Sequence, residues 1–176
     1  MGISKVILIL IQIFWFILPA YAANAFPPLL RGKRPLDFGK SWRGKPILGK
    51  GKTMEGTIGG IIFGCLVGFS QLYFQSYVET YLPLIELTPI LVVLLSAGAI
   101  LGDIVASFFK RRAGIKRGEP VPLMDQLDFI LGALLLSSIF KRLPLLHFSL
   151  IIVLTPLIHL LANGISYLLK IKSVPY

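Results

Sequence analysis

Long apolar runs recur along this chain, and they constrain its fold more than any other feature. An α-helix needs about 20 apolar residues to cross the hydrocarbon core of a bilayer. Backbone polar groups must be satisfied internally in lipid, so such runs fold as helices. The sequence therefore predicts an all-α polytopic integral membrane protein, a single domain over residues 1–176 with five transmembrane helices and two polar loops. The predicted spans cover about residues 3–23, 57–74, 87–109, 122–140 and 145–169.

The composition supports this fold class. Hydrophobic residues make up 55% of the chain and charged residues only 15%, whereas about 25% of an average soluble domain is charged. The formal net charge of +10 would suggest nucleic acid on a soluble protein. In a membrane chain, topology and anionic ligands explain it better. We therefore expect membrane lipids among the partners, and no nucleic acid.

Three glycines in the second predicted span indicate close helix packing. Gly60, Gly64 and Gly68 are spaced four residues apart, so they form a stripe of small residues on one helix face. Cys65 is the only cysteine and cannot form an intrachain disulfide. We expect it to pack as a small apolar residue.

The distribution of Lys and Arg predicts the orientation in the membrane. With five spans, the first loop (about residues 24–55), the third loop and the C-terminus share one side, which carries fifteen of the 18 cations. Lys5, Lys141 and Arg142 lie on the other side. Loops rich in Lys and Arg remain cytoplasmic. We therefore expect a multi-pass cell-membrane protein with its N-terminus outside, and with both polar loops and the C-terminus in the cytoplasm.

The first loop is rich in both glycine and basic residues, which allows two interpretations. It is either a solvated charge run that sets topology or a flexible loop that binds phosphates. The stretch 44–51 nearly matches a P-loop, but Gly51 stands where Ser or Thr is required, so we reject that motif. What remains is a loop whose glycine N–H groups, together with Lys50, Lys52 and Thr53, can donate to phosphate oxygens.

A polar stretch between the third and fourth spans contains the other candidate site residues. If the third helix continues through Arg111, then Asp103, Ser107, Lys110 and Arg111 share one face at i, i+4, i+7 and i+8. A carboxylate at mid-bilayer costs about 2.5–3.5 kcal/mol on insertion scales, so Asp103 is expected to be functional. The alternative is an ion pair with Lys110 or Arg111.

Asp125 and Asp128, at i and i+3, share a face of the next helix. The alternative here is a structural one, because acids in the first turns of a helix are stabilised by its dipole. Three carboxylates together are better explained by a hard divalent cation that prefers oxygen ligands. Mg²⁺ bound by Asp103, Asp125 and Asp128 would join these acids to phosphates held by the nearby cations.

These residues carry a resemblance. The pattern Gly102-Asp103-x-x-x-Ser107-x-x-Lys110-Arg111, followed by Lys116 and Asp125-x-x-Asp128, resembles the signature of phosphatidate cytidylyltransferases, membrane enzymes that transfer CMP from CTP to a lipid phosphate. Ala106, Arg117 and Gln126 depart from that signature. The first-loop stretches 24–27, 35–39 and 48–56 are similar to the short archaeal branch, the CDP-archaeol synthases, whose five-span arrangement covers this whole chain.

The resemblance implies a CTP-dependent cytidylyltransferase that uses Mg²⁺. Its partners would be CTP and an isoprenoid ether lipid phosphate, 2,3-bis-O-geranylgeranyl-sn-glycerol 1-phosphate, and its products CDP-archaeol and pyrophosphate. The implied catalytic residues are Asp103, Lys110, Arg111, Asp125 and Asp128, and the three aspartates are also the implied metal ligands. The implied substrate-binding residues are Asn24, Asp37, Lys50, Lys52, Thr53, Ser107 and Lys116. Ser107 would hydrogen-bond either a phosphate or a helix carbonyl.

Two alternatives stay open at this level. One is a CDP-diacylglycerol synthase that acts on phosphatidate, and the other is a non-enzymatic membrane protein whose basic loops bind anionic lipids, each cation contributing about 1 kcal/mol. A CDP-alcohol phosphotransferase is excluded, because its longer aspartate motif is missing. The residues leave tail specificity and oligomeric state undetermined.

Overall fold

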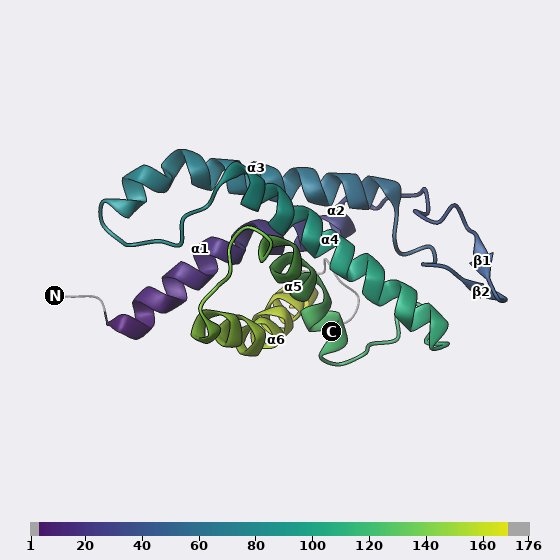
Figure 1. Ribbon diagram of the computed structural model, residues 1–176. Helices are drawn as coiled ribbons and strands as arrows, with labels where there is room; N and C mark the ends of the chain where they lie inside the picture. Colours follow the sequence, from purple (N-terminus) through teal and green to yellow (C-terminus); the bar gives the residue numbers. More distant parts are fainter. Residues whose placement is uncertain (1–3, 169–176) are drawn as a thin grey trace.

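The computed structural model describes residues 4–168 as a helix bundle with a small hairpin at one end (Figure 1). The predicted ends of the first and last spans, residues 3 and 169, lie outside the described residues, as do Lys170 and Lys172. The elements are α1 (Lys5–Ala25), α2 (Pro27–Leu30), β1 (Ser41–Trp42), β2 (Lys45–Pro46), α3 (Met54–Glu79), α4 (Pro89–Arg112), α5 (Met124–Ser137) and α6 (Leu145–Leu168).

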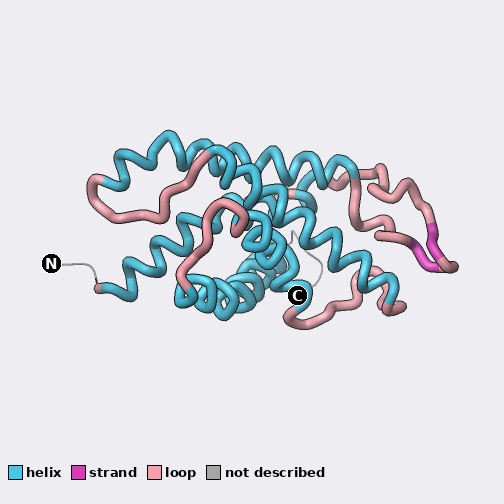
Figure 2. The backbone as a smooth tube through the Cα atoms, in the orientation of Figure 1, coloured by secondary structure: helices cyan, strands magenta, loops and turns pink. Residues whose placement is uncertain are grey.

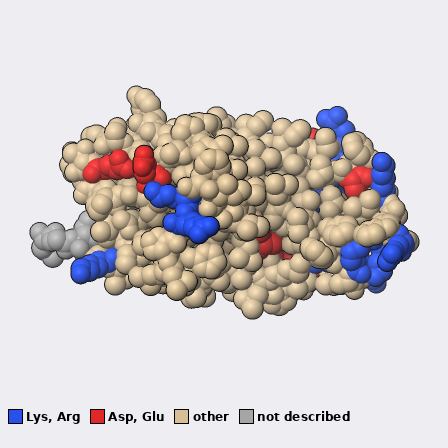
Figure 3. Space-filling view, viewed as in Figure 1, with Lys and Arg blue, Asp and Glu red and all other residues tan. Residues whose placement is uncertain are grey.

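The polar loops gather at one end of the bundle. The antiparallel hairpin β1–β2 and the loop between α4 and α5 lie at the end opposite the N-terminus and the α3–α4 loop (Figures 1 and 2). Figure 3 shows Lys and Arg side chains concentrated at the hairpin end. The first and third loops of the sequence therefore share one side of the bundle.

Side-chain caps and a left-handed glycine set the ends of α3 and α4. Thr53 caps α3, where its Oγ1 accepts a hydrogen bond from Gly56 N at 3.1 Å, and Thr88 caps α4, which opens with Pro89. The α4 helix stops where Gly114 adopts a φ of 84°, a conformation that glycine reaches without a Cβ penalty.

The predicted glycine stripe is confirmed as a close-packing surface. Gly60, Gly64 and Gly68 are all buried on α3. A Cβ added at Gly64 would lie 2.7 Å from Pro19 O on α1 and 2.7 Å from Ser96 Oγ on α4. The glycine face of α3 therefore packs against both neighbouring helices, as small residues allow in membrane bundles.

A second glycine contact, which the sequence analysis did not predict, lies between α4 and α5. A Cβ at Gly98 would lie 2.7 Å from Gly132 O, and one at Gly102 would clash with the backbone carbonyl of Asp128. The two backbones therefore nearly touch, which requires glycine at the contact. This crossing brings the backbone beside Asp103 against the backbone of Asp128.

The predicted fourth span is longer than the helix that forms. The structure has α5 at Met124–Ser137, 14 residues, or about 21 Å at 1.5 Å per residue, against a hydrocarbon core of about 30 Å. The helix starts late because Leu123 has a φ of 65°, which interrupts helical geometry. Four helical segments in the described chain are long and apolar enough to cross a membrane by themselves: Lys5–Leu30, Met54–Glu79, Pro89–Arg112 and Leu145–Ala162. A helix forms at each of the five predicted places, but only four in the described chain are long enough to cross a membrane, so the predicted length of the fourth span was wrong.

Candidate active site

The first loop is organised around Asp37. Its Oδ2 accepts hydrogen bonds from Leu48 N at 2.8 Å and Gly49 N at 2.9 Å, and its Oδ1 accepts one from Gly39 N at 3.0 Å. Partial burial works against the ionised form, but the three N–H donors outweigh it, so the pKa of Asp37 lies below its usual value. The predicted substrate contact is therefore not a free carboxylate: Asp37 holds the loop in shape.

Backbone hydrogen bonds between the two ends of the first loop hold residues 52–54 next to the bundle. Leu36 N donates to Lys52 O at 2.7 Å, and Met54 N donates to Arg34 O at 2.9 Å. Thr53 lies between these two bonds and its hydroxyl caps α3. The Thr53 side chain, predicted to bind substrate, is therefore used inside the protein.

The central contact of the site joins this loop to α4. Lys52 Nζ donates to Asp103 Oδ2 in an ion pair that is about three-quarters buried on both sides. The predicted alternative, an ion pair of Asp103 with Lys110 or Arg111, is wrong. Lys110 lies seven residues further along the same helix, about 10.5 Å along its axis, beyond the reach of Asp103.

Lys110 pairs across the helix crossing instead. Its Nζ donates to Asp125 Oδ1 at 2.5 Å, and Asp125 Oδ2 accepts from Val121 N at 3.0 Å. Asp125 lies in the first turn of α5, so the interpretation as a helix-start acid also applies to it. Both of its oxygens are engaged, one with a lysine and one with the chain entering α5.

The carboxylate of Asp128 interacts electrostatically with residues of both ion pairs. Its Oδ1 accepts from Phe129 N at 2.6 Å, and the charges of Asp103, Lys52 and Lys110 all act on its carboxylate. No salt bridge to Asp128 forms within residues 4–168. Three carboxylates and two lysines from two helices and a loop therefore form one interacting group.

The predicted three-carboxylate metal site is not assembled in this structure. Among the described residues, no group of three or more Asp, Glu, His or Cys side chains is close enough to hold a metal ion. Asp103 and Asp125 each face a lysine instead, while the charge of Asp103 still acts on Asp128. That Asp103, Asp125 and Asp128 together bind a metal ion therefore stays a prediction.

Arginines flank the glycine-rich turn at residues 49–51. A Cβ at Gly49 would lie 3.9 Å from Arg111 Nη1, and one at Gly51 would lie 3.2 Å from Arg117 Nε. The buried Nε of Arg111 has no hydrogen-bond partner in the described chain. The turn therefore lies next to guanidinium groups from the third loop and the end of α4, which suits an anion.

The other predicted residues are placed as follows. Ser107 is buried, and within residues 4–168 it makes no side-chain hydrogen bond, unlike Ser96, whose hydroxyl donates to Val92 O. The helix-carbonyl alternative for Ser107 is therefore not realised. Lys50 and Lys116 are exposed, and Asn24 is half-buried near the end of α1.

Sequence reasoning missed the residues that dock the hairpin on α4. Arg112 donates to three hairpin carbonyls, those of Trp42, Lys45 and Pro46. The Trp42 ring stacks on Phe108 with centroids 5.9 Å apart. The signal that could have indicated this contact was a lone tryptophan in an otherwise glycine-rich basic loop.

Bilayer-length helices and a buried group of acids and lysines at their polar end define a class, that of multi-pass membrane enzymes that act on phosphorylated substrates. The model of the CDP-archaeol synthase family (CarS-like) matches residues 6–176. The chain therefore belongs to this family, and it is a CTP-dependent lipid cytidylyltransferase of archaeal membranes. The predicted family resemblance is confirmed.

Individual relatives agree with the family match. The chain is 46% identical to the CDP-archaeol synthase of Methanospirillum hungatei, over 90% of this chain and 99% of that protein. It is 42% identical to the enzyme of Pyrococcus abyssi, over 94% and 97%. A solved structure of an intramembrane enzyme for archaeal membrane lipid biosynthesis matches with a TM-score of 0.75 at 36% identity, covering 85% of this chain and 91% of that one.

Proposed function

We propose that this enzyme transfers CMP from CTP to the phosphate of 2,3-bis-O-geranylgeranyl-sn-glycerol 1-phosphate, giving CDP-archaeol and pyrophosphate. A phosphate oxygen of the lipid forms a bond to the α-phosphorus of CTP while the bond from that phosphorus to the pyrophosphate oxygen breaks. Such a reaction needs no nucleophile from the protein. The protein must hold two anions together and neutralise the charge that spreads over their oxygens.

The observation that carries the proposal is the Lys52–Asp103 contact. It joins the glycine-rich loop to the helix crossing at which Asp128 lies, so a nucleotide held by the loop is adjacent to the acids. Lys50, Lys52 and Lys116 would bind CTP, together with Asn24, while Asp37 and Thr53 keep the loop in shape. Lys110 and Arg111 would orient the reacting phosphates, and the unpaired hydroxyl of Ser107 would donate to one of them.

The acids also fit a divalent cation by charge. Three carboxylates face two lysines, which leaves an excess negative charge, and hard cations prefer carboxylate oxygens. Asp103 and Asp128, with Asp125, would hold Mg²⁺, and the ion would neutralise phosphate charge when bound. Phosphates entering the site would give Lys52 and Lys110 new anionic partners and so release the carboxylates they now face.

An apolar groove suits the lipid chains. It has a volume of about 640 Å³, runs between α4 and α5, and includes Asp128 in an otherwise mainly apolar lining. An isoprenoid chain lying in this groove would bring its glycerol phosphate to the acids at the helix crossing. A direct comparison of diether and diacyl lipid phosphates tests the choice of lipid.

The test is a substrate comparison with the purified full-length chain in liposomes. CTP labelled at its α-phosphate should transfer label to the diether lipid phosphate and release one pyrophosphate per lipid. Phosphatidate, the matching diacyl lipid, should be a poorer substrate by kcat/KM. Equal or faster turnover of phosphatidate would overturn the proposed substrate, and absence of pyrophosphate release with either lipid would overturn the reaction.

We further propose that the hairpin end of the bundle faces the cytoplasm, with the N-terminus outside. The shared position of both polar loops (Figure 2) and their basic charge support this orientation. In a Cys65→Ala background, a cysteine at Ser41 should react with a membrane-impermeant thiol reagent only from the cytoplasmic side. A cysteine at Tyr77 should react only from outside, and the opposite pattern would reverse the orientation.

A further inference from the structure

The hairpin β1–β2 is too small to be stable on its own. Each strand has two residues, all of them exposed, and two-stranded hairpins are marginal in water even when longer. Its shape and position must therefore come from contacts outside it. Those contacts converge on the last turn of α4, and Arg112 makes most of them.

The guanidinium of Arg112 is matched to the hairpin backbone. Nη1 donates to Trp42 O at 2.6 Å, and Nη2 donates to Lys45 O at 3.0 Å and to Pro46 O. No carboxylate pairs with Arg112 in the described part of the chain. Its charge is balanced by carbonyl dipoles and by the negative end of the α4 helix dipole.

The contact is reciprocal and includes a stack of side chains. Lys45 Nζ donates to Arg112 O at 2.9 Å, which satisfies one of the carbonyls left unpaired at the end of α4. The Arg112 guanidinium lies 5.3 Å from the centre of the Trp42 ring and 5.4 Å from that of Phe108. Cation–π contact thus adds to the hydrogen bonds.

Docking of the hairpin sets the position of the residues that follow it. Three residues after β2, Gly49 lies beside Arg111, and Lys52 then reaches Asp103. Neighbouring arginines at the end of α4 therefore have different tasks: Arg112 holds the hairpin, and Arg111 lies beside the turn that follows it. We propose that Arg112 is a positioning residue, which by docking Trp42 and the hairpin keeps the glycine-rich turn and Lys52 in place for the nucleotide.

This inference rests on the proposed role of the first loop in binding CTP. Arg112→Ala should raise the KM for CTP by about tenfold or more and change kcat much less, as loss of binding common to ground and transition states does. Arg112→Lys should resemble Arg112→Ala, because an ammonium cannot donate to three carbonyls in this plane or stack as a guanidinium does. Trp42→Ala should have the same effect, whereas Trp42→Phe keeps a stacking ring and should restore most of the affinity.

The matched control is Arg43→Ala. Arg43 also lies over the Trp42 ring, at 5.4 Å, but the structure shows no hydrogen bond from its side chain to the hairpin within residues 4–168. Its removal should change the KM for CTP by no more than about two- to fivefold, the level expected for one exposed cation–π contact, and by less than Arg112→Ala does. A large effect of Arg43→Ala together with none of Arg112→Ala would overturn the assignment.

A second readout does not depend on activity. In a Trp15→Phe background, Trp42 is the sole tryptophan, so quenching of its fluorescence by acrylamide reports hairpin docking directly. Arg112→Ala should increase quenching, and CTP should reduce it again. Unchanged quenching and an unchanged KM for CTP in Arg112→Ala would overturn the inference. If the parent enzyme consumed no CTP, the proposed function would fail, while the quenching difference would still report the docking.

Discussion

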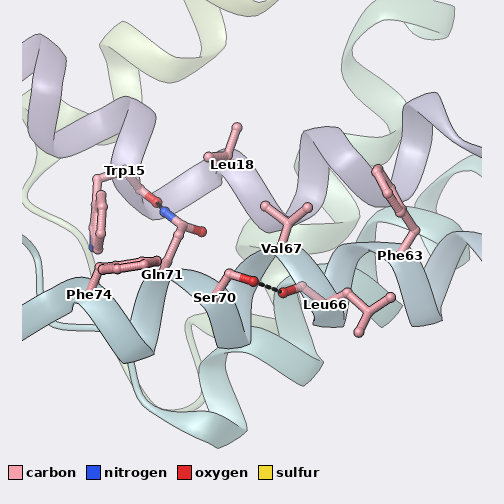
Figure 4. Close-up of a pocket in the computed structure, with 8 residues that line it drawn as sticks. All are labelled: Trp15, Leu18, Phe63, Leu66, Val67, Ser70, Gln71 and Phe74. Carbon is pink, nitrogen blue, oxygen red and sulfur yellow. Dashed lines mark hydrogen bonds between the residues drawn. The ribbon is translucent and has the colours of Figure 1, made fainter.

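Of two apolar grooves in the described part of the bundle, one is lined by neutral residues alone and the other includes a carboxylate. The groove between α1 and α3 has a volume of about 460 Å³ and a neutral lining that includes Trp15, Gln71 and Phe74 (Figure 4). The groove between α4 and α5 is larger, at about 640 Å³, and includes Asp128. Helices that face lipid leave apolar grooves between them in any case, so volume alone does not indicate a substrate site. The chemistry at the end of the groove does.

The difference arises from what the glycine contacts bring together. On α3, Gly64 packs against Pro19 and Ala23 of α1, and the polar groups of that groove are amides and a hydroxyl: Gln71 Nε2 donates to Trp15 O at 2.8 Å. On α4, Gly102 packs against the backbone of Asp128. The same kind of packing thus produces a structural groove in one place and a charged pocket end in the other.

The largest expected effect on activity comes from neutralising the acids at the charged end of the α4–α5 groove. Asp103→Asn, Asp125→Asn and Asp128→Asn should each lower kcat/KM by about 10²–10³-fold, the range for lost charge stabilisation, while the protein still inserts and folds. Each variant should also need more Mg²⁺ for half-maximal rate. The measurement is initial rate against Mg²⁺ concentration in the liposome assay.

The control for these acids is Glu86→Gln, an equivalent change at an exposed position in the loop between α3 and α4. It should leave the rate within about twofold, as most surface substitutions do. A near-normal Mg²⁺-dependent rate in any one of the three aspartate variants would remove that residue from the site.

Substituting the two lysines that face these acids should have a smaller effect, and a different kinetic constant should change for each lysine. Lys110→Ala should mainly lower kcat, by about 10²-fold, because its contact lies where charge develops on the phosphates. Lys52→Ala should mainly raise the KM for CTP. Titrating CTP and lipid separately distinguishes the two, with the exposed Lys40→Ala as control. If Lys52→Ala instead lowers kcat alone, the first loop is catalytic and the division is reversed.

The smallest expected effect comes from filling each groove with a larger side chain. Leu101 and Leu66 are exposed leucines that line the α4–α5 and the α1–α3 groove respectively. Leu101→Trp should raise the KM for the lipid phosphate by about tenfold without changing that for CTP, whereas Leu66→Trp should change neither. Equal effects of the two substitutions would contradict the proposal that the lipid substrate binds in the α4–α5 groove, next to the charged residues.

Features set by local periodicity were predictable from the sequence. The apolar runs predicted five membrane-crossing helices, of which four have that length in the described chain. The spacing of Gly60, Gly64 and Gly68 predicted a packing face that the structure confirms. The extension of the third span through Arg111, which aligns Asp103 with Ser107, is also found, since α4 ends at Arg112. Helical periodicity is a property of neighbouring residues, so these predictions needed no tertiary information.

Features that depend on distant partners were not predictable. Asp103 pairs with Lys52, 51 residues away in sequence, whereas sequence reasoning could offer only cations on its own helix. Gly98 and Gly102 are also spaced four apart, on α4, but only the tertiary structure shows that they pack against Gly132 and Asp128 of α5. The late start of α5 depends on the positive φ of Leu123, which residue type does not indicate.

The sequence alone determined that this chain is a helical membrane protein, and its motifs identified the family and predicted the acids and cations of the site. Only the tertiary structure decided how those charges pair, that Asp37 and Thr53 hydrogen-bond within the first loop and the start of α3, and that Arg112 docks the hairpin. The physical reason is that lipid imposes helix formation on any long apolar run, so the bundle follows from composition. The partner of a charge depends instead on which backbones can approach, and here glycine contacts between helices decide that.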